Sequence, residues 1–235
     1  MVKNVSVVLN EPRFPENIGA AARCCRNMGI SSLIVVRPEL LDREKMFKMA
    51  THEAADIVEN MKIYDSLYDA LSPFGHVVGT TARQGRERRP THSPKEAAVL
   101  IRRLAVNNQV AILFGSENKG LSNAHLRFCN TLINIPTTDF RSINLAQSVM
   151  IVCYELFVSG EPEDLHVPKL SNVYETEAMY AHLSQMFQAI GLYGKREPGY
   201  WMSRARRFLG RCELRSRDVR LIRGLCRQVL NALCH

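Results

Sequence analysis

Apolar residues in the first 158 positions follow two alternating periods. Short, β-branched runs bounded by turn residues predict buried strands at residues 5–9, 33–36, 76–80, 110–114 and 131–135. Helical spacing between those runs predicts helices at residues 17–28, 43–60, 66–71, 93–106, 122–128 and 143–158. This repeated strand–helix order predicts an α/β fold, a parallel sheet flanked by helices on both faces.

A polar segment with two prolines and a glycine, residues 159–168, interrupts the helical spacing. Helices are predicted again at 174–190, 199–209 and 216–233, and the first carries an apolar stripe that we expect to pack: Met179, Leu183, Met186, Phe187 and Ile190. The sequence therefore predicts a main domain over residues 1–159, a linker over 160–173 and a small all-α domain over 174–235.

The charge of the chain is concentrated in that last domain. Residues 1–194 hold 20 Lys+Arg and 20 Asp+Glu, whereas residues 195–235 hold 11 Lys+Arg and 3 Asp+Glu, so the net charge of +8 lies entirely in the tail. A run of charge is often only a solvated face, but cations this dense with few acids indicate a polyanionic partner. Nucleic acid is the partner that we expect.

Composition narrows the cellular setting. The seven cysteines are odd in number and form no C-x-x-C pair, which argues against a disulfide framework or a zinc site and favours packing thiols in a reducing cytoplasm. Residues 1–9 run directly into a strand pattern without a signal-peptide core, and no apolar run approaches the ~20 residues that span a bilayer. We expect a soluble, cytoplasmic protein without a membrane partner.

Ligands of parallel sheets bind beyond the carboxyl ends of the strands, so the loops there are the candidate site. Four segments follow predicted strands: N-I-G-A-A-A-R at 17–23, G-T-T-A-R at 79–83, L-F-G-S-E-N-K-G-L at 113–121 and I-P-T-T-D-F-R-S-I-N-L-A-Q at 135–147. Each has an ordinary structural interpretation. Arg23 can be a solvated helix residue, the loop at 113–121 a β–α turn, and Ser142 a helix cap with Asn144 in the first turn.

The glycines also have structural interpretations. Gly19 and the following alanines allow the first helix to pack closely against the sheet, while the two glycines of 113–121 suit a backbone that approaches a ligand. None of the segments is a G-x-G-x-x-G or Walker A motif, so spacing does not indicate a dinucleotide or a nucleoside triphosphate.

The order of the motifs is the specific signal. N-x-G-x-x-x-R, then F-G-x-E-x-x-G-L, then I-P-x(5)-S-I-N-L-A resembles the three motifs of the SPOUT methyltransferases, in the branch of TrmH-like (SpoU class) ribose methyltransferases. This resemblance covers residues 1–158. Segments of the tail such as Met179-Tyr-Ala-His-Leu183 and Arg206-Arg-Phe-Leu209 are similar to the C-terminal region of the TrmJ family of tRNA methyltransferases.

The resemblance implies a fold and a cofactor. It implies a trefoil knot at the end of the α/β domain, which general topology rules treat as an exception. It also implies that S-adenosylmethionine binds in the knot, leaving as S-adenosylhomocysteine, and that a homodimer completes the site. The family's cofactor positions correspond here to Thr80, Thr81, Ala82, Gly115, Ile135, Arg141, Ser142 and Ile143.

The resemblance also implies the chemistry. Arg23 matches the family's catalytic arginine, and Asn17, Glu117, Ser142 and Asn144 match the other motif positions. A guanidinium with a pKa of roughly 12 or more rarely loses its proton, so we expect Arg23 to orient the target hydroxyl, stabilise its developing charge and clamp the phosphate. The other four side chains would hold Arg23 and the catalytic loops in register. This scheme needs no metal.

The expected activity is 2′-O-methylation of tRNA, at the anticodon-loop pyrimidine of position 32. Alternatives are ribosomal RNA as the substrate, or a non-catalytic RNA-binding protein that keeps the SPOUT fold. RNA contacts are expected from the basic loop and the tail, namely Arg83, Arg86, Arg88, Arg89, Arg204, Arg206, Arg207 and Arg211. Tyr193, Tyr200 and Trp201 can stack on unpaired bases or close a helical core.

Overall fold

The computed structural model describes the 235-residue chain except residues 1–2, 83–90, 141, 162–165, 193–197 and 234–235. It consists of two compact units, Met1–Val167 and Pro168–His235. The predicted basic loop at 83–89 lies outside the described residues. No helix within the described ranges is both long and apolar enough to span a membrane.

The first unit is built on a parallel sheet, as predicted. Its strand order is β3-β2-β1-β6-β4-β7-β5, and every pairing is parallel. The strands are β1 Val5–Asn10, β2 Ser32–Val36, β3 Lys62–Tyr64, β4 His76–Thr80, β5 Thr91–His92, β6 Val110–Phe114 and β7 Thr131–Ile133. The prediction missed the two edge strands, β3 and β5, because they are only three and two residues long. The trefoil knot stays a prediction, since strand order and register do not test it.

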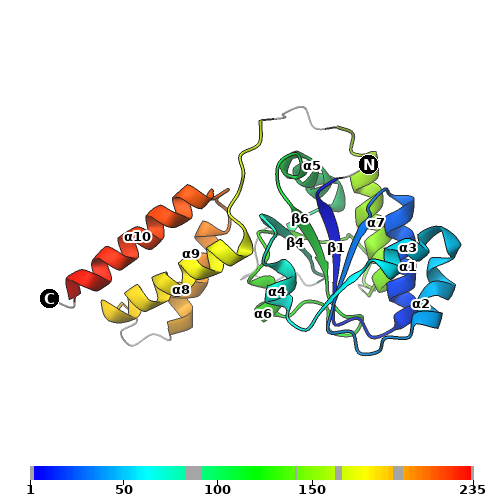
Figure 1. The fold of residues 1–235 in the computed structure, drawn as a ribbon, viewed down its shortest axis with the longest axis horizontal. Helices are drawn as coiled ribbons and strands as arrows, with labels where there is room; N and C mark the ends of the chain where they lie inside the picture. The colour runs from blue at the N-terminus through cyan, green and yellow to red at the C-terminus, as the bar shows by residue number, and fades with distance from the viewer. Residues whose placement is uncertain (1–2, 83–90, 141, 162–165, 193–197, 234–235) are drawn as a thin grey trace. The chain divides into compact units, whose positions relative to one another are not determined.

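Helices cover both faces of the sheet, with α1, α2, α3 and α7 on one side and α4 and α6 on the other (Figure 1). Their bounds are α1 Pro15–Asn27, α2 Arg43–Ala50, α3 Ala55–Glu59, α4 Leu67–Leu71, α5 Pro94–Ala105, α6 Asn123–Leu126 and α7 Leu145–Val158. The single helix predicted over 43–60 was wrong: Thr51, with φ 60° and ψ 174°, ends α2, and a 3-10 turn at His52–Ala54 precedes α3.

Helix α1 owes its position to a glycine and to small buried side chains. A Cβ on Gly19 would lie 2.0 Å from the carbonyl oxygen of Met46, so the glycine is required for α1 to approach α2. The prediction had Gly19 packing against the sheet; the close neighbour is instead the backbone of α2. Cys24 faces α7, where its Sγ donates to the carbonyl oxygen of Ala146 at 3.5 Å. Burial raises the pKa of Cys24 to about 11, so its thiol stays protonated and acts as a packing residue.

The second unit contains α8 Val173–Ala189, α9 Pro198–Leu209 and α10 Ser216–Leu233. Asn172 and Glu175 form a capping box at the start of α8. The core holds Met179, Tyr180, Leu183, Val219 and Cys226, with Met186 and Phe187 packed against it. The predicted stripe of α8 is therefore a packing face except at its end, because Ile190 is exposed.

Candidate active site

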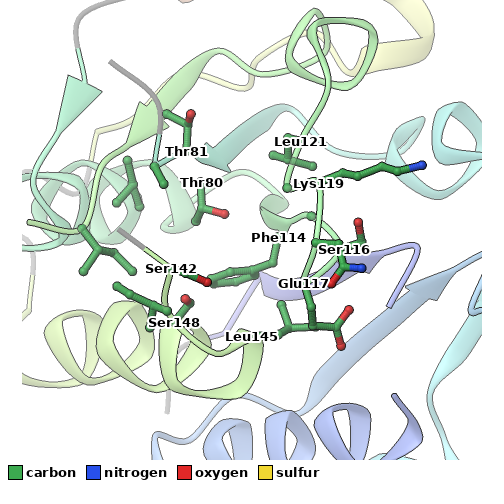
Figure 2. Close-up of a pocket in the computed structure, with 17 residues that line it drawn as sticks. Thr80, Thr81, Phe114, Ser116, Glu117, Lys119, Leu121, Ser142, Leu145 and Ser148 are labelled. Atoms are coloured by element: carbon green, nitrogen blue, oxygen red, sulfur yellow. The ribbon is translucent and has the colours of Figure 1, made fainter. Parts of the chain in front are cut away.

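A cavity of about 310 Å³ lies at the carboxyl ends of the strands, between the loops that follow β4, β6 and β7 and the start of α7 (Figure 2). Seven of the eight predicted cofactor residues line it: Thr80, Thr81, Ala82, Gly115, Ile135, Ser142 and Ile143. The eighth, Arg141, lies outside the described residues. Thr80, Ser142 and Ser148 converge on the cavity from β4, from the loop before α7 and from α7 itself.

Hydrogen bonds between neighbouring strands shape this edge of the sheet. Thr80 Oγ1 donates to the carbonyl oxygen of Leu113 at 3.2 Å, and the Thr81 amide donates to the carbonyl oxygen of Ile133 at 2.9 Å. Asn134 Nδ2 donates in turn to the carbonyl oxygen of Thr81 at 2.8 Å. The end of β4 is thereby fixed to both neighbours, β6 and β7, and its loop enters the cavity with a defined backbone.

The loop after β6 is a closed turn that depends on its two glycines. The Gly120 amide donates to the carbonyl oxygen of Ser116 at 2.8 Å, and Gly120 adopts a φ of 61°. A Cβ on Gly115 would lie 2.2 Å from the backbone carbon of Gly120, so no larger residue fits where the turn closes. This turn presents Glu117 and Lys119 on its outer side.

Three motif side chains that are far apart in the sequence form one hydrogen-bonded chain. Glu117 accepts from Asn17 Nδ2 at 2.7 Å through Oε1 and from the Arg13 amide at 2.9 Å through Oε2. Asn144 Nδ2 donates to Asn17 Oδ1 at 3.0 Å. The chain connects the start of α1, the loop after β6 and the start of α7, so the structure brings the three motifs together beside the cavity.

The start of α7 differs from the prediction in one respect. Asn144, and not Ser142, is the N-cap, because Asn144 Oδ1 accepts from the amides of Ala146 and Gln147 at 2.9 and 3.3 Å. The predicted cap was therefore the wrong residue. Ser142 is exposed and lines the cavity, which leaves its hydroxyl directed at whatever the cavity holds.

Arg23 lies elsewhere. It is on α1, two turns after Asn17, with an exposed side chain, and it is not among the residues that line the cavity of its own chain. Within the described part of the chain it has neither a hydrogen-bond partner nor an ion-pair partner. Its guanidinium is thus available to a group outside this chain.

The predicted RNA-binding arginines have unequal surroundings. Arg83, Arg86, Arg88 and Arg89 lie outside the described residues. Arg206 is directed into the helical unit, where it pairs with both oxygens of Glu177 and its guanidinium carbon lies 4.1 Å from the ring centroid of Tyr180. The side chains of this pair are only 19% and 14% exposed, so Arg206 is a packing residue of the unit. Arg204, Arg207 and Arg211 are on the same helix or just after it.

Sequence reasoning missed part of the cavity wall. The apolar residues Phe114, Leu121, Ile133 and Leu145 line it, as do the polar residues Asn118, Lys119 and Ser148. The apolar residues read as ordinary core positions in a sequence. Ser148 was detectable in principle, because it follows Asn144 by one helical turn and so shares its side of α7.

Within the described ranges, no group of three or more His, Cys, Asp or Glu side chains is placed to bind a metal.

Comparison with known proteins gives concordant matches for both units. The model of the SpoU rRNA Methylase family matches residues 4–154, and that of the C-terminal domain of the tRNA methyltransferase TrmJ matches residues 174–234. The tRNA (cytidine/uridine/adenosine-2′-O-)-methyltransferase TrmJ of Pseudomonas aeruginosa is 34% identical over 240 residues, which cover 96% of this chain and 93% of that protein. The tRNA (cytidine/uridine-2′-O-)-methyltransferase TrmJ of Sodalis glossinidius is 34% identical over 233 residues, 96% and 91% of the two chains.

The fold is similar as well. The crystal structure of TrmJ from Z. mobilis ZM4 superposes with a TM-score of 0.83 at 28% identity, covering 96% of this chain and 98% of the other.

Proposed function

Because the chain belongs to the SpoU rRNA methylase family, and within it to the TrmJ group, we propose that it is an S-adenosylmethionine-dependent tRNA 2′-O-ribose methyltransferase. The observation that carries this proposal is the chain of hydrogen bonds from Asn144 through Asn17 to Glu117 beside the cavity. A domain that had kept only the fold would have no need for these polar side chains, so their connection argues against the non-catalytic alternative.

The cavity has the lining that an adenosine derivative requires. Apolar side chains of Ile135, Leu121 and Leu145 offer a surface for a purine ring, and Thr80 and Ser142 offer hydroxyl groups at its rim. Residues 80–82, 115, 135 and 142–143 would hold the cofactor, and Arg141 would join them. When bound, S-adenosylmethionine supplies a methyl group on a positively charged sulfur.

The chain's own residues then have to position the ribose and accommodate charge. The 2′-hydroxyl loses its proton to solvent, and a fixed guanidinium stabilises the alkoxide character that this leaves on the oxygen. Held in line, the oxygen then bonds to the methyl carbon as the carbon–sulfur bond breaks. We assign that role to Arg23, acting on the site of a second copy of the chain because it lies outside its own cavity. Asn17, Glu117 and Asn144 hold the loops in register, and Ser142 contacts the bound molecules from the cavity rim.

A homodimer is therefore part of the proposal. Helix α7 has an exposed apolar stripe, Ile151, Tyr154 and Val158, at the spacing of one helix face, with Phe157 beside it. Exposed apolar stripes of this kind favour burial against a partner. Because α7 packs next to α1, which carries Arg23, a two-fold contact through this stripe would bring Arg23 towards the second copy.

RNA is held by cations outside the cavity. Arg204, Arg207 and Arg211 in the tail, together with the loop of Arg83, Arg86, Arg88 and Arg89, would contact phosphates and orient the substrate. We place Arg206 in the structure of the unit instead. The target is the ribose of position 32 in the anticodon loop; ribosomal RNA is the second candidate, because the matching family model is named for rRNA methylation.

Three measurements test this function. The purified protein should transfer labelled methyl groups from S-adenosylmethionine to tRNA, and ribose-methylation mapping should place the product at position 32. Transfer only to ribosomal RNA would select the second candidate. Calorimetry tests the non-catalytic alternative. RNA binding without any binding of S-adenosylmethionine would show that the protein is non-catalytic.

A further inference from the structure

A second cavity adjoins the first. It has a volume of about 340 Å³ and is lined by Glu11, Arg13, Glu39, Ser116, Asn118 and Lys119. The last three of these residues also line the first cavity, so the two spaces share one wall, the turn after β6. Figure 2 shows Lys119 extending away from Ser142 and Ser148, on the outer side of that turn. The matched motif side chains of Asn17, Arg23, Glu117, Ser142 and Asn144 do not line the second cavity.

Glu11, which lines this cavity, and its ion-pair partner Arg37 both have an unusual backbone conformation. Glu11 and Arg37 follow directly after the paired ends of β1 and β2, and both adopt positive φ angles, 54° and 43°. Their side chains pair with each other, and their amides continue the sheet by donating to the carbonyl oxygens of Val36 and Tyr64. Non-glycine residues rarely occupy this region, and such conformations cluster where a protein binds a ligand.

An ion pair forms the rim. Arg13 Nε donates to Glu39 Oε2 at 2.8 Å, and the Glu39 amide donates to the carbonyl oxygen of Pro12 at 3.0 Å, which ties the two loops together. Arg13 holds the pKa of Glu39 below its usual value, with Lys119 contributing, so the carboxylate stays ionised. In the described part of the chain, Glu39 Oε1 and the terminal nitrogens of Arg13 have no partner. A hydrogen-bond acceptor, Glu39 Oε1, and hydrogen-bond donors, the terminal nitrogens of Arg13, therefore lie next to each other on two paired side chains.

This charge pattern selects the class of ligand. The wall has two carboxylates, Glu11 and Glu39, and two cations, Arg13 and Lys119, so its charges largely balance. Glu39 pairs with Arg13, and Glu11 pairs with Arg37, which does not line the cavity. A phosphate would meet these carboxylates, whereas a nucleobase is neutral and presents donors next to acceptors on its edge. The exposed ring of Phe14 is also available for stacking on a base, because its centroid lies 5.5 Å from the guanidinium carbon of Arg13.

We propose that the second cavity binds the base of the target nucleotide, with Glu39 accepting a hydrogen bond from the base and Arg13 donating one to it. This inference rests on the proposed methyl transfer, since it places the base next to the cavity that holds the methyl donor. The Arg13 amide holds Glu117. Arg13 thus connects the base-binding residues to the hydrogen-bonded chain of the active site through its backbone, which a side-chain substitution leaves intact.

The test compares two substrates and two variants of the full-length protein. The substrates are tRNA with cytidine at the target and the same tRNA with pyrimidin-2-one riboside, which lacks only the 4-amino donor. The wild type should methylate the second about tenfold less efficiently in kcat/KM, the loss expected for one base-edge contact. Glu39→Ala should remove this difference while binding S-adenosylmethionine normally. Glu44→Ala, at an exposed residue of α2 without a described ion pair, is the control and should keep the difference.

Three results would overturn the inference. The first is a Glu39→Ala variant that still distinguishes the two substrates tenfold, and the second is a wild type that treats them alike. The third is a uniform loss for both substrates in Arg13→Ala with a weaker salt dependence, which would identify a phosphate site. Absence of methyl transfer by the wild type to any RNA is a different outcome, because it refutes the proposed function itself.

Discussion

Asn144 Nδ2 donates a hydrogen bond of 3.0 Å to Asn17 Oδ1, although 127 positions separate the two residues in the sequence. The same Asn144 side chain caps α7 through its oxygen, so one amide both starts a helix and joins it to α1. Its two functions can be separated, because the oxygen performs the first and the nitrogen performs the second.

We predict that Asn144→Asp and Asn144→Ala differ in stability but not in activity. Asp keeps a capping oxygen and should unfold like the wild type, whereas Ala should lose about 1 kcal/mol of stability with the cap. Both variants lack the donor to Asn17, so both should lose methyl transfer. Urea unfolding and transfer of labelled methyl to tRNA measure the two effects. An active Asn144→Asp variant would show that the link to Asn17 is dispensable.

Gly19→Ala should destabilise the first unit. The new Cβ would lie 2.0 Å from the Met46 carbonyl oxygen, so α1 and α2 have to separate, at a cost of about 1–3 kcal/mol typical of overpacking. Gly224→Ala in α10 is the control. A Cβ there meets nothing within 4 Å, and alanine should stabilise the helix by about 0.5–1 kcal/mol. Thermal unfolding should move in opposite directions for the two variants; equal shifts would contradict the packing argument.

The strands, the helix break at Thr51 and the cap of α7 show how much of the fold the sequence could predict. Strand positions were predictable because buried parallel strands are continuous apolar runs, as in β6, which was predicted with its observed bounds. The break at Thr51 was not predictable, because apolar spacing continues through it and only the backbone angles interrupt the helix. Likewise, Ser142 and Asn144 are both good caps by type, and tertiary contact with Asn17 decided between them.

The site itself divides in the same way. Motif order predicted which loops meet, but no pattern indicated that Arg206 would be directed into its own unit, since Glu177 is 29 positions away and reads as a solvated residue. The second cavity was also beyond sequence reasoning. It depends on Glu11 and Arg37, which both adopt a left-handed backbone conformation. Glutamate and arginine rarely do so, and no sequence pattern therefore indicated it.

Lowering the pH should weaken the first unit through His125. Burial, and then Arg37, lower the pKa of His125, while Glu11 opposes them, and the neutral ring accepts from the Ser122 amide at 3.3 Å. The unfolded chain then binds more protons than the folded one below about pH 6.5, so stability falls as the pH drops through that value. His125→Gln keeps the capping-box acceptor without titrating. Urea midpoints at pH 7 and pH 5 should differ less for this variant than for the wild type; an equal difference would exclude His125 as the cause.

The tail arginines should separate into two groups. Arg206→Met removes the two hydrogen bonds that Arg206 makes to the largely buried Glu177 carboxylate and should cost about 2 kcal/mol of stability. Arg204→Ala and Arg211→Ala should leave unfolding unchanged but weaken tRNA binding, each lowering the slope of log affinity against log salt by about 0.7–0.9 per lost phosphate contact. Thermal unfolding and binding titrations at several salt concentrations measure both effects. A stable Arg206→Met variant with a lowered salt slope would return Arg206 to the RNA-binding group.

The assignment of Arg23 to the site of a second copy can be tested by mixing inactive variants. Arg23→Ala should lose methyl transfer but bind S-adenosylmethionine normally, because Arg23 does not line the cavity of its own chain. Glu117→Ala should also be inactive, since it removes the acceptor for Asn17 and for the Arg13 amide. A mixed dimer then has one intact site, in which the cavity of the Arg23→Ala chain meets the Arg23 of the other.

Random re-association of equal amounts would make half of the dimers mixed, each with one working site of two, so about a quarter of wild-type activity should return. The control mixes Arg23→Ala with a second preparation of itself and should stay inactive. If Arg23 instead served its own chain, the mixed dimer would have no intact site, because one chain would lack Arg23 and the other Glu117. Recovery of activity on mixing therefore distinguishes action between copies from action within one, and its absence, with mixed dimers verified by mass, would refute the assignment.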